Sequence, residues 1–212
     1  MLNIVKQRVF LFDFDGVIVD SVNIKTEAFA ELYRPFGEKV ISKVVRHHRS
    51  HGGMSRFEKI HYYHKQYLNQ DLSNSDLMKL ANRFSRMVLN KVTKAPFIKG
   101  SFQFLKLLKD KNKILFIISG TPEDEIKKII KKRHLNRFFK DVKGSPLSKQ
   151  ENIERILKKY GILATDCVYF GDSKEDSDAA SSVSIVFVGI NYSCRKKGYK
   201  DFAQMIRRMG HR

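Results

Sequence analysis

Two short apolar runs in this chain end in clusters of aspartate. The run at residues 9–12 leads into DFDG at 13–16, and the run at 168–170 leads into GDSKED at 171–176. Unbroken apolar runs of this length are typical of strands in parallel sheets, which are covered on both faces. A carboxylate is costly to bury inside such a strand, whereas one placed just after it can reach a ligand. The pattern therefore predicts two buried strands that carry carboxylates to one edge of a sheet.

A third apolar run points to the same edge. Residues 114–118 are followed by Ser119, Gly120 and Thr121, which supply hydroxyl and backbone N–H groups. Ligands of open parallel sheets bind beyond the carboxyl ends of the strands. We therefore expect an active site where the three runs end.

Length and composition limit the class of protein. The 212 residues, 42% of them hydrophobic, are enough for a sizeable core in one domain or in a domain with an insert. No stretch approaches the roughly 20 apolar residues of a membrane helix, and Asp13 interrupts the N-terminal run before it could form the core of a signal peptide. We expect a cytoplasmic protein with no membrane partner. Cys167 and Cys194 lack the spacing of a metal site and are interpreted as ordinary thiols.

The formal net charge of +19 raises the question of nucleic-acid binding. Part of this charge lies at residues 122–133, where isoleucines take one face of a predicted helix and lysines the other, as on a solvated helix face. The basic clusters at 195–197 and 207–208 have no aromatic stacking motif beside them. We therefore expect that nucleic acid is not the partner. The sequence leaves the oligomeric state open.

The interval between Asp15 and Ser119 is about 70 residues longer than a strand-helix-strand unit of roughly 30 residues requires. Apolar positions recur in it at helical spacing, and Ser55 with Glu58 has the pattern of a capping box. We expect helices at about 24–32, 40–45, 57–67 and 77–88. They would form an all-α cap, with residues 20–95 in the cap and residues 1–19 and 96–212 in the core.

After the cap the pattern alternates between strands and helices, which is typical of a doubly wound α/β sheet. Thr121, Pro122 and Asp124 are interpreted as the start of one helix, and Ser148 with Glu151 as the capping box of another. The other expected elements are strands near 138–142 and 185–188 and helices at 102–108, 148–160 and 202–209. The predicted fold class is α/β, a Rossmann-like doubly wound parallel sheet core with an inserted all-α cap domain.

These residues resemble the motifs of the haloacid dehalogenase-like hydrolase superfamily. All four motifs occur in order: DFDG at 13–16 looks like the first, Ser119 the second, Lys149 the third and GDSKED at 171–176 the fourth. The resemblance covers the core through its motifs and the cap only through its position. It implies a Rossmann-like fold with a helical cap of the phosphoglycolate phosphatase-like kind.

The residues also suit the hydrolysis of a phosphate monoester. Asp13 would attack phosphorus and form an aspartyl-phosphate, while Asp15 would protonate the leaving oxygen and then deprotonate water. Ser119, the N–H group of Gly120 and Lys149 would hold the phosphoryl oxygens.

A magnesium ion is expected for electrostatic reasons. Asp13, Asp15, Asp172 and Asp176 would gather about four carboxylates beside a dianionic substrate, and a hard divalent cation relieves that repulsion. Asp13 and Asp172 are the expected direct ligands of Mg²⁺. The resemblance adds the backbone carbonyl of Asp15 and leaves Asp176 to orient Lys149 or water on the metal.

Each assignment has a structural alternative. Asp15 could merely cap the turn before Gly16, and Ser119 could be an ordinary loop residue. Lys149 could be a solvated helix lysine, and Asp176 could be a charge that favours the N-terminus of a helix.

The segment at 46–56 concentrates cations and glycines where a loop of the cap could face the core. An acidic or polyhydroxylated substrate would suit such a segment. The competing interpretation puts His48 on the apolar face of a helix and the arginines in solvent. The segment is a poor metal site, because no carboxylate or cysteine lies nearby in sequence. The candidates for substrate recognition are Arg46, Arg49, His51 and Arg56.

The sequence thus predicts a Mg²⁺-dependent phosphatase that acts on a small phosphate monoester, of the phosphosugar, sugar-acid phosphate or phosphoglycolate type. Asp15 argues against a dehalogenase or a phosphonatase, because the resembling enzymes lack an acid at that position. A β-phosphoglucomutase-like mutase shares Asp13 and Asp15 and stays open as an alternative. A non-catalytic binding module with a basic surface is an alternative from a different class.

Overall fold

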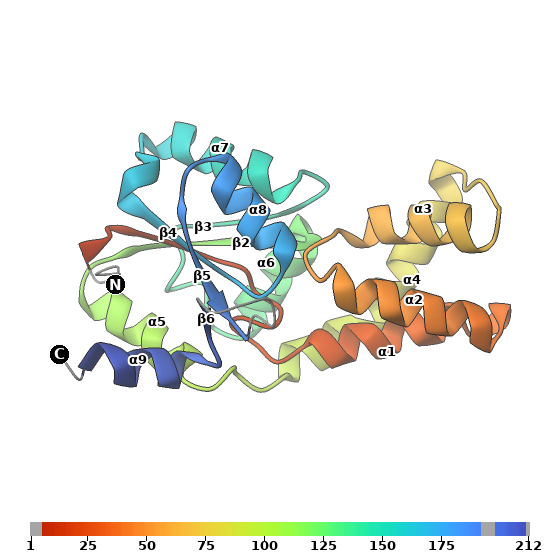
Figure 1. Ribbon diagram of the computed structural model, residues 1–212, viewed down its shortest axis with the longest axis horizontal. Coiled ribbons are helices and arrows are strands. Elements are labelled where there is room, and N and C mark those ends of the chain that lie inside the picture. Colours follow the sequence, from red (N-terminus) through yellow and green to blue (C-terminus); the bar gives the residue numbers. More distant parts are fainter. Residues whose placement is uncertain (1–5, 192–197, 211–212) are drawn as a thin grey trace.

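The computed structural model describes residues 6–191 and 198–210, and a six-stranded sheet lies in the left part of the molecule in Figure 1. The strand order is β3-β2-β1-β4-β5-β6, and neighbouring strands are parallel. The order reverses between β1 and β4, which is where sheets of this type bind their ligands. The strands are β1 Val9–Phe12, β2 Ile114–Pro122, β3 Asp141–Ser145, β4 Cys167–Gly171, β5 Val186–Ile190 and β6 Gly198–Tyr199.

Helices cover both faces of this sheet. They are α5 Ser101–Asp110, α6 Glu123–Lys132, α7 Lys149–Tyr160, α8 Lys174–Ser182 and α9 Phe202–Gly210. Successive side chains of a strand point to opposite faces. Phe10 and Phe12 accordingly join the core under α5, α6 and α9, while Val9 and Leu11 join the core under α7 and α8. The predicted α/β fold with a parallel sheet is confirmed.

Four more helices are inserted between β1 and β2 and extend from one side of the sheet (Figure 1). They are α1 Val22–Leu32, α2 Glu38–Ser50, α3 Arg56–Tyr67 and α4 Asn74–Lys94. Phe29 of α1 lies in their interior, with its ring centroid 4.4 Å from that of Phe84 and 5.8 Å from that of Tyr63. The helices lie where the sequence predicted a cap. The limits of 20–95 for a cap domain, with 1–19 and 96–212 for a core domain, stay a prediction.

One strand lies later in the chain than predicted. The strand expected near 138–142 is β3, which begins at Asp141. Phe138 is buried against Phe102 of α5, with 5.8 Å between ring centroids. The apolar residue that suggested a strand therefore packs from the turn that precedes it.

One helix also starts later than predicted. Thr121 was expected to cap it, but α6 begins at Glu123. The reason is that β2 continues to Pro122, which pairs with Ser145 of β3. The Thr121 hydroxyl donates to the carboxylate of Asp15 instead of capping the helix.

The lysine face of α6 is confirmed, because the helix buries its three isoleucines and exposes its lysines. In the part of the chain that the structure describes, no helix is long and apolar enough to span a membrane. Cys167 is buried in β4 as a free thiol. Cys194 and the basic cluster at 195–197 lie outside the described residues.

Arg133, just after α6, binds the C-terminal end of α4. Its Nη1 donates to the carbonyl oxygens of Val92 at 3.2 Å, Thr93 at 2.7 Å and Ala95 at 2.7 Å. The last carbonyls of a helix lack partners within the helix and carry the negative end of its dipole. The guanidinium supplies both a donor and a positive charge. It therefore fixes α4 to α6 where the chain returns from the insertion to the sheet.

Replacing Arg133 by methionine should lower the free energy of unfolding by about 1–3 kcal/mol, because hydrogen bonds to a charged donor are lost. Lys128→Met, on the exposed face of α6, is the matched control and should change it by less than about 0.5 kcal/mol. Urea unfolding followed by circular dichroism measures both variants. Equal stabilities of the two variants would show that the hydrogen bonds of Arg133 to the end of α4 do not stabilise the fold.

Candidate active site

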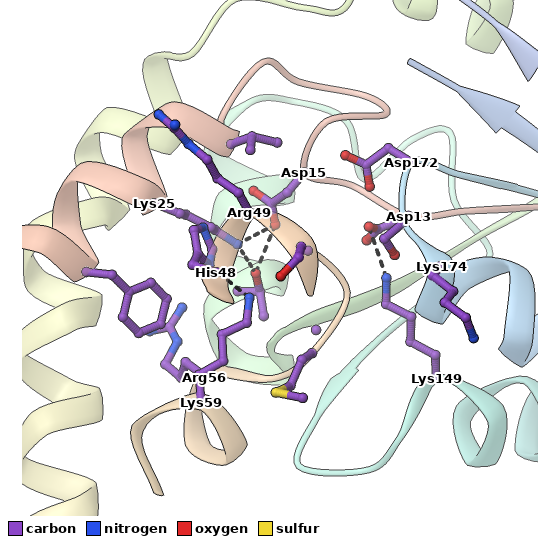
Figure 2. Close-up of a pocket in the computed structure, with 18 of the residues that line it drawn as sticks. Asp13, Asp15, Lys25, His48, Arg49, Arg56, Lys59, Lys149, Asp172 and Lys174 are labelled. Atoms are coloured by element: carbon purple, nitrogen blue, oxygen red, sulfur yellow. Dashed lines mark hydrogen bonds and ion pairs between the residues drawn. The ribbon is translucent and has the colours of Figure 1, made fainter. Parts of the chain in front are cut away.

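Strand ends meet at one edge of the sheet. Phe12 of β1 pairs with Ile117 of β2 and with Phe170 of β4, so the residues that follow these positions converge. Asp13 comes directly after β1, and Asp172 directly after β4. Figure 2 shows Asp13 between Asp172 and Lys149.

The carboxylate of Asp13 is held through both of its oxygens. Oδ1 accepts from the backbone N–H of Phe14 at 2.7 Å, and Oδ2 lies 3.0 Å from Nζ of Lys149. Burial raises the pKa of Asp13 to about 7, with Lys149 opposing the rise and the carboxylates of Asp176 and Asp15 adding to it. The carboxylate of Asp13 is therefore fixed in orientation, and a further positive charge nearby would lower its pKa and favour its ionised form.

Lys149 lies in the first turn of α7, where Ser148 and Glu151 form the predicted capping box. Its Nζ is 2.5 Å from Oδ1 of Asp176 as well as 3.0 Å from Asp13. Burial acts to lower the pKa of Lys149, but the two carboxylates hold it above its usual range. The alternative of a solvated helix lysine is therefore wrong.

Asp176 accepts hydrogen bonds from four donors. Oδ1 accepts from Lys149 and, at 2.7 Å, from the hydroxyl of Tyr169. Oδ2 accepts from the backbone N–H of Ser173 at 3.1 Å and from its hydroxyl at 2.5 Å. Ser173 is the residue that caps the N-terminus of α8. Asp176 is thus both the charge at a helix N-terminus and the anchor of Lys149. A carboxylate with four donors is poorly suited to bind a metal directly, so the indirect role fits it better.

The acidic cluster fits a divalent cation. Oxygens of Asp13, Asp172 and Asp176 lie within 4.8 Å of one another. Burial, together with the charge of Asp13, raises the pKa of Asp172 well above its usual range, so a positive partner would favour its ionised form. Gly16 has a φ of +78°, and a Cβ atom there would lie 2.0 Å from Oδ2 of Asp172. The turn after β1 therefore makes room for this carboxylate, and oxygen donors of this kind suit Mg²⁺.

Asp15 turns toward the inserted helices. Its Oδ1 accepts from the hydroxyl of Ser21 at 2.5 Å, and its Oδ2 accepts from Nζ of Lys25 and, at 3.1 Å, from the hydroxyl of Thr121. Burial acts to raise the pKa of Asp15, but Lys25 and the two hydroxyls lower it overall. Asp15 therefore does more than cap the turn before Gly16, which was the alternative role, because it contacts side chains of both the insertion and β2.

β2 brings Ser119 and Gly120 to the same edge, and Gly120 lines the cavity. Ser119 is buried, and its Oγ accepts from the backbone N–H of Thr121 at 3.1 Å. Its hydroxyl therefore supports the loop, as its alternative role requires, and its contact with phosphate stays a prediction. A Cβ atom on Gly120 would lie 2.9 Å from the carbonyl oxygen of Gly53, so the loop of the insertion closes tightly on the end of β2.

A cavity of about 340 Å³ lies between this edge and the inserted helices. Among the predicted recognition residues, Arg49 and Arg56 line it. Arg49 is exposed, as the competing interpretation has it. A volume of this size is at the lower end of that of small-molecule sites.

Arg46 and His51 are the other two residues predicted to recognise substrate, and their contact with it stays a prediction. Neither lines the cavity in the described part of the chain. Arg46 lies on the exposed face of α2, because the residues that this helix buries lie on its other face. His51 directly follows α2, and its ring stacks on that of His47 with 4.0 Å between centroids.

Arg56 lines the cavity, but its guanidinium is already bound. It donates to both oxygens of Glu125 of α6, at 2.8 and 2.7 Å, and also to the hydroxyl of Ser85. The face of the guanidinium lies 4.7 Å from the ring centroid of Phe84. Bidentate pairs of this kind fix geometry strongly. Arg56 therefore joins α3 to α6, and its use in substrate recognition stays a prediction.

Among the lysines that line the cavity, sequence analysis missed Lys25 and Lys59 of the inserted helices. Lys59 is 2% exposed, and its Nζ lies 2.8 Å from Nδ1 of His48, which is itself buried on the apolar face of α2 as the competing interpretation has it. Helical spacing carried a signal for both, because Lys25 follows Ser21 by four residues and Lys59 precedes the buried Tyr63 by four. The signal was weak, since lysines at such spacing are normally solvated.

Residues 10–190 match the model of a family described as haloacid dehalogenase-like hydrolase. The chain is 23% identical over 207 residues to the phosphoglycolate phosphatase of Pseudomonas savastanoi pv. phaseolicola. The matched region covers 87% of this chain and 70% of that protein. The structure of this chain is similar to that of a predicted phosphoglycolate phosphatase from Haemophilus somnus, with a TM-score of 0.73, 16% identity and coverage of 95% of this chain and 97% of that one. It is also similar to the HAD-hydrolase YfnB of Bacillus subtilis bound to magnesium, with a TM-score of 0.70, 16% identity and coverage of 97% and 99%.

The family match extends from β1 to the end of β5 and includes the inserted helices. It therefore contains all the residues from which the sequence resemblance was drawn. The expected enzyme class, a hydrolase of this type, is confirmed, as is the likeness to phosphoglycolate phosphatases. The chain belongs to the haloacid dehalogenase-like hydrolase family.

Proposed function

We propose that this chain is a Mg²⁺-dependent phosphatase that hydrolyses a small phosphate monoester through an aspartyl-phosphate on Asp13. The observation that carries the proposal is the fixed carboxylate of Asp13 at the cavity wall, 3.0 Å from the buried ammonium of Lys149. A nucleophile held beside a positive charge can meet a phosphoryl group whose oxygens need that charge. The relatives named above support the substrate class.

The reaction has two steps. In the first, a carboxylate oxygen of Asp13 forms a bond to phosphorus, the ester P–O bond breaks, and Asp15 gives a proton to the leaving alcohol. In the second, water attacks the phosphorus of the aspartyl-phosphate and gives a proton to Asp15. The carboxylate of Asp13 then leaves, and inorganic phosphate is released.

Lys149 and the backbone N–H of Gly120 would hold the phosphoryl oxygens in both steps. The ammonium of Lys149 is held in place before substrate arrives, and a fixed positive charge stabilises a transition state that carries negative charge on these oxygens. Asp13 and Asp172 would hold Mg²⁺, with the backbone carbonyl of Asp15 as a further ligand. The ion, when bound, would supply positive charge to the transferring phosphoryl group.

Asp15 has the contacts of a group that changes protonation state during the reaction. Lys25 favours its ionised form, which is the form that accepts a proton from water in the second step. A phosphate dianion in the cavity would bring negative charge near Asp15 and favour its protonated form, which the first step requires. The two roles therefore follow from the charge that the substrate brings.

The size of the cavity, about 340 Å³, favours a small metabolite over a macromolecule. A phosphosugar, a sugar-acid phosphate and phosphoglycolate all remain within this class. Cytoplasmic location and the absence of a nucleic-acid partner stay predictions.

Asp13→Asn should lower kcat on phosphoglycolate or an aryl phosphate by about 10⁴-fold or more, because the nucleophile is lost. Release of inorganic phosphate measures this, and an unchanged Tm checks the fold. Hydrolysis at the wild-type rate by Asp13→Asn would contradict the proposed mechanism. A wild-type protein that releases no phosphate but interconverts phosphosugars when a sugar bisphosphate is added would be a mutase instead.

Asp15→Asn should separate the two steps when p-nitrophenyl phosphate is the substrate. This leaving group needs little protonation, so the first step should continue while hydrolysis of the aspartyl-phosphate slows by about 10²- to 10⁴-fold. Rapid mixing should then show a burst of p-nitrophenol close to one equivalent per enzyme, followed by slow turnover. Alkyl phosphates should give no burst. Full steady-state activity without a burst would rule out Asp15 as the acid and base.

Removal of divalent metal with EDTA should abolish activity, and Mg²⁺ should restore it. Mg²⁺ should also raise the Tm of the wild type, because an ion that binds the folded state stabilises it by about 2.7 kcal/mol at 100 times its Kd. Asp172→Asn should weaken both effects by raising the Mg²⁺ concentration that they require. Asp178→Asn, an exposed change on α8, is the matched control. Equal Mg²⁺ dependence in the two variants would contradict the assignment of Asp172.

A further inference from the structure

Lys59 is a buried cation whose contacts, within the described residues, include no carboxylate at ion-pair distance. Its Nζ lies 2.8 Å from Nδ1 of His48 and 5.8 Å from the ring centroid of Phe29. The carboxylates whose charges act on it are Glu175 and Asp15. Each of these is engaged elsewhere, Glu175 with the backbone of the loop at Gly53 and Asp15 with Lys25.

The other buried or partly buried cations around the cavity are neutralised. Lys25 is paired with Asp15, Arg56 with Glu125, and Lys149 with Asp13 and Asp176. Lys59 differs from them because its hydrogen-bond partner, His48, is neutral. Burial, together with the charge of Lys59, lowers the pKa of His48 to about 2.

This arrangement is unfavourable for the empty protein. Burial lowers the pKa of Lys59 to about 7, and the charges of Lys25 and Lys149 contribute to the lowering. An ammonium buried without a counter-charge destabilises a fold, whereas an apolar side chain of similar volume would pack there at no such cost. An anion in the cavity would remove the penalty by providing the missing charge.

Lys59 lies where the far end of a substrate would be. Figure 2 shows Lys59, His48 and Lys25 on one side of the cavity and Asp13, Asp172 and Lys149 on the other. The same cavity of about 340 Å³ is lined by both groups. A phosphoryl group bound at Asp13 therefore directs the remainder of a small substrate toward Lys59.

We infer that Lys59, with His48, forms a subsite for a second anionic group on the substrate. The substrate class is then a phosphate monoester that also carries a carboxylate or a second phosphate. Because Nδ1 of His48 accepts from Lys59, its ring hydrogen is on Nε2, and His48 lines the same cavity as Lys59. The inference rests on the proposed function, since it concerns the far end of the same substrate.

The test compares substrates that differ in this one group. Phosphoglycolate and ethyl phosphate differ by a carboxylate in place of a methyl group. Wild-type kcat/KM should favour phosphoglycolate, and Lys59→Met should lower that preference by about 10- to 100-fold, the value of a charge-assisted hydrogen bond lost. Most of the loss should lie in KM, because the contact with the second anionic group is the same in the bound substrate and in the transition state. Lys39→Met, an exposed lysine of α2, is the matched control and should leave the preference unchanged.

Binding provides a readout that does not depend on turnover. Isothermal titration calorimetry with 3-phosphonopropionate and with propylphosphonate, in the presence of Mg²⁺, compares the same two groups on molecules that cannot be hydrolysed. The wild type should bind the carboxylate compound more tightly, and Lys59→Met should bind the two about equally. The Tm of Lys59→Met should be equal to or above that of the wild type, because the uncompensated charge is gone.

A second pair of substrates identifies which anion the subsite takes. Fructose 1,6-bisphosphate and fructose 6-phosphate differ by a second phosphate. A preference for the bisphosphate that Lys59→Met removes, with no preference for phosphoglycolate, would assign the subsite to phosphate. The opposite pattern would assign it to a carboxylate.

The outcomes separate this inference from the proposed function. If the wild type hydrolyses ethyl phosphate and the doubly anionic compounds equally well, the function stands and the inference fails. Equal losses on all substrates in Lys59→Met would also overturn it, because Lys59 would then support the site as a whole. If no compound is hydrolysed but the difference in phosphonate binding is present and depends on Lys59, the inference stands and the proposed activity fails.

Discussion

The ammonium of Lys149 between Asp13 and Asp176 is the interaction on which the rest of the site depends. Parallel strands end at one edge, so β1 and β4 bring like charges together there, and burial would make their repulsion severe. Lys149 enters from the first turn of α7, where the helix dipole disfavours a cation. The two carboxylates outweigh that effect. Because Asp176 also caps α8 through Ser173, the start of that helix and the position of the ammonium depend on the same carboxylate.

A second group of ion pairs joins the inserted helices to the sheet. Lys25 of α1 reaches Asp15, and Arg56 of α3 reaches Glu125 of α6. A Cβ atom on Gly120 would lie 2.9 Å from the backbone of the inserted loop, so the two parts are also in close steric contact. The wall of the cavity is therefore assembled from two parts of the chain. Since Asp15 takes its partners from both, a movement of α1 away from the sheet would change the charge around the proposed acid and base.

The sequence predicted those parts of the site that follow from the sheet. Apolar runs mark the strands, and residues just after parallel strands must converge, so Asp13 and Asp172 were found without a structure. The cap was harder, because α2 and α3 are rich in cations on several faces and spacing alone does not say which face meets the core. Arg46 was chosen and is exposed, while Lys59 was passed over and is buried. Burial of a lysine is decided by tertiary packing, which no local pattern records.

The net charge of +19 combines two physically different populations of cations. The lysines of α6 are exposed opposite its buried isoleucines, where water and salt screen them and each contributes little. Lys59 and Lys149 are buried beside the cavity, where the same charge is weakly screened and acts strongly on its neighbours. Lys149 has carboxylates to compensate it and Lys59 has a neutral histidine. Proteins tend to break the rules of stable packing at the sites they use, so burial beside the cavity, rather than the total charge, distinguishes the cations with a proposed function from those that keep the surface solvated.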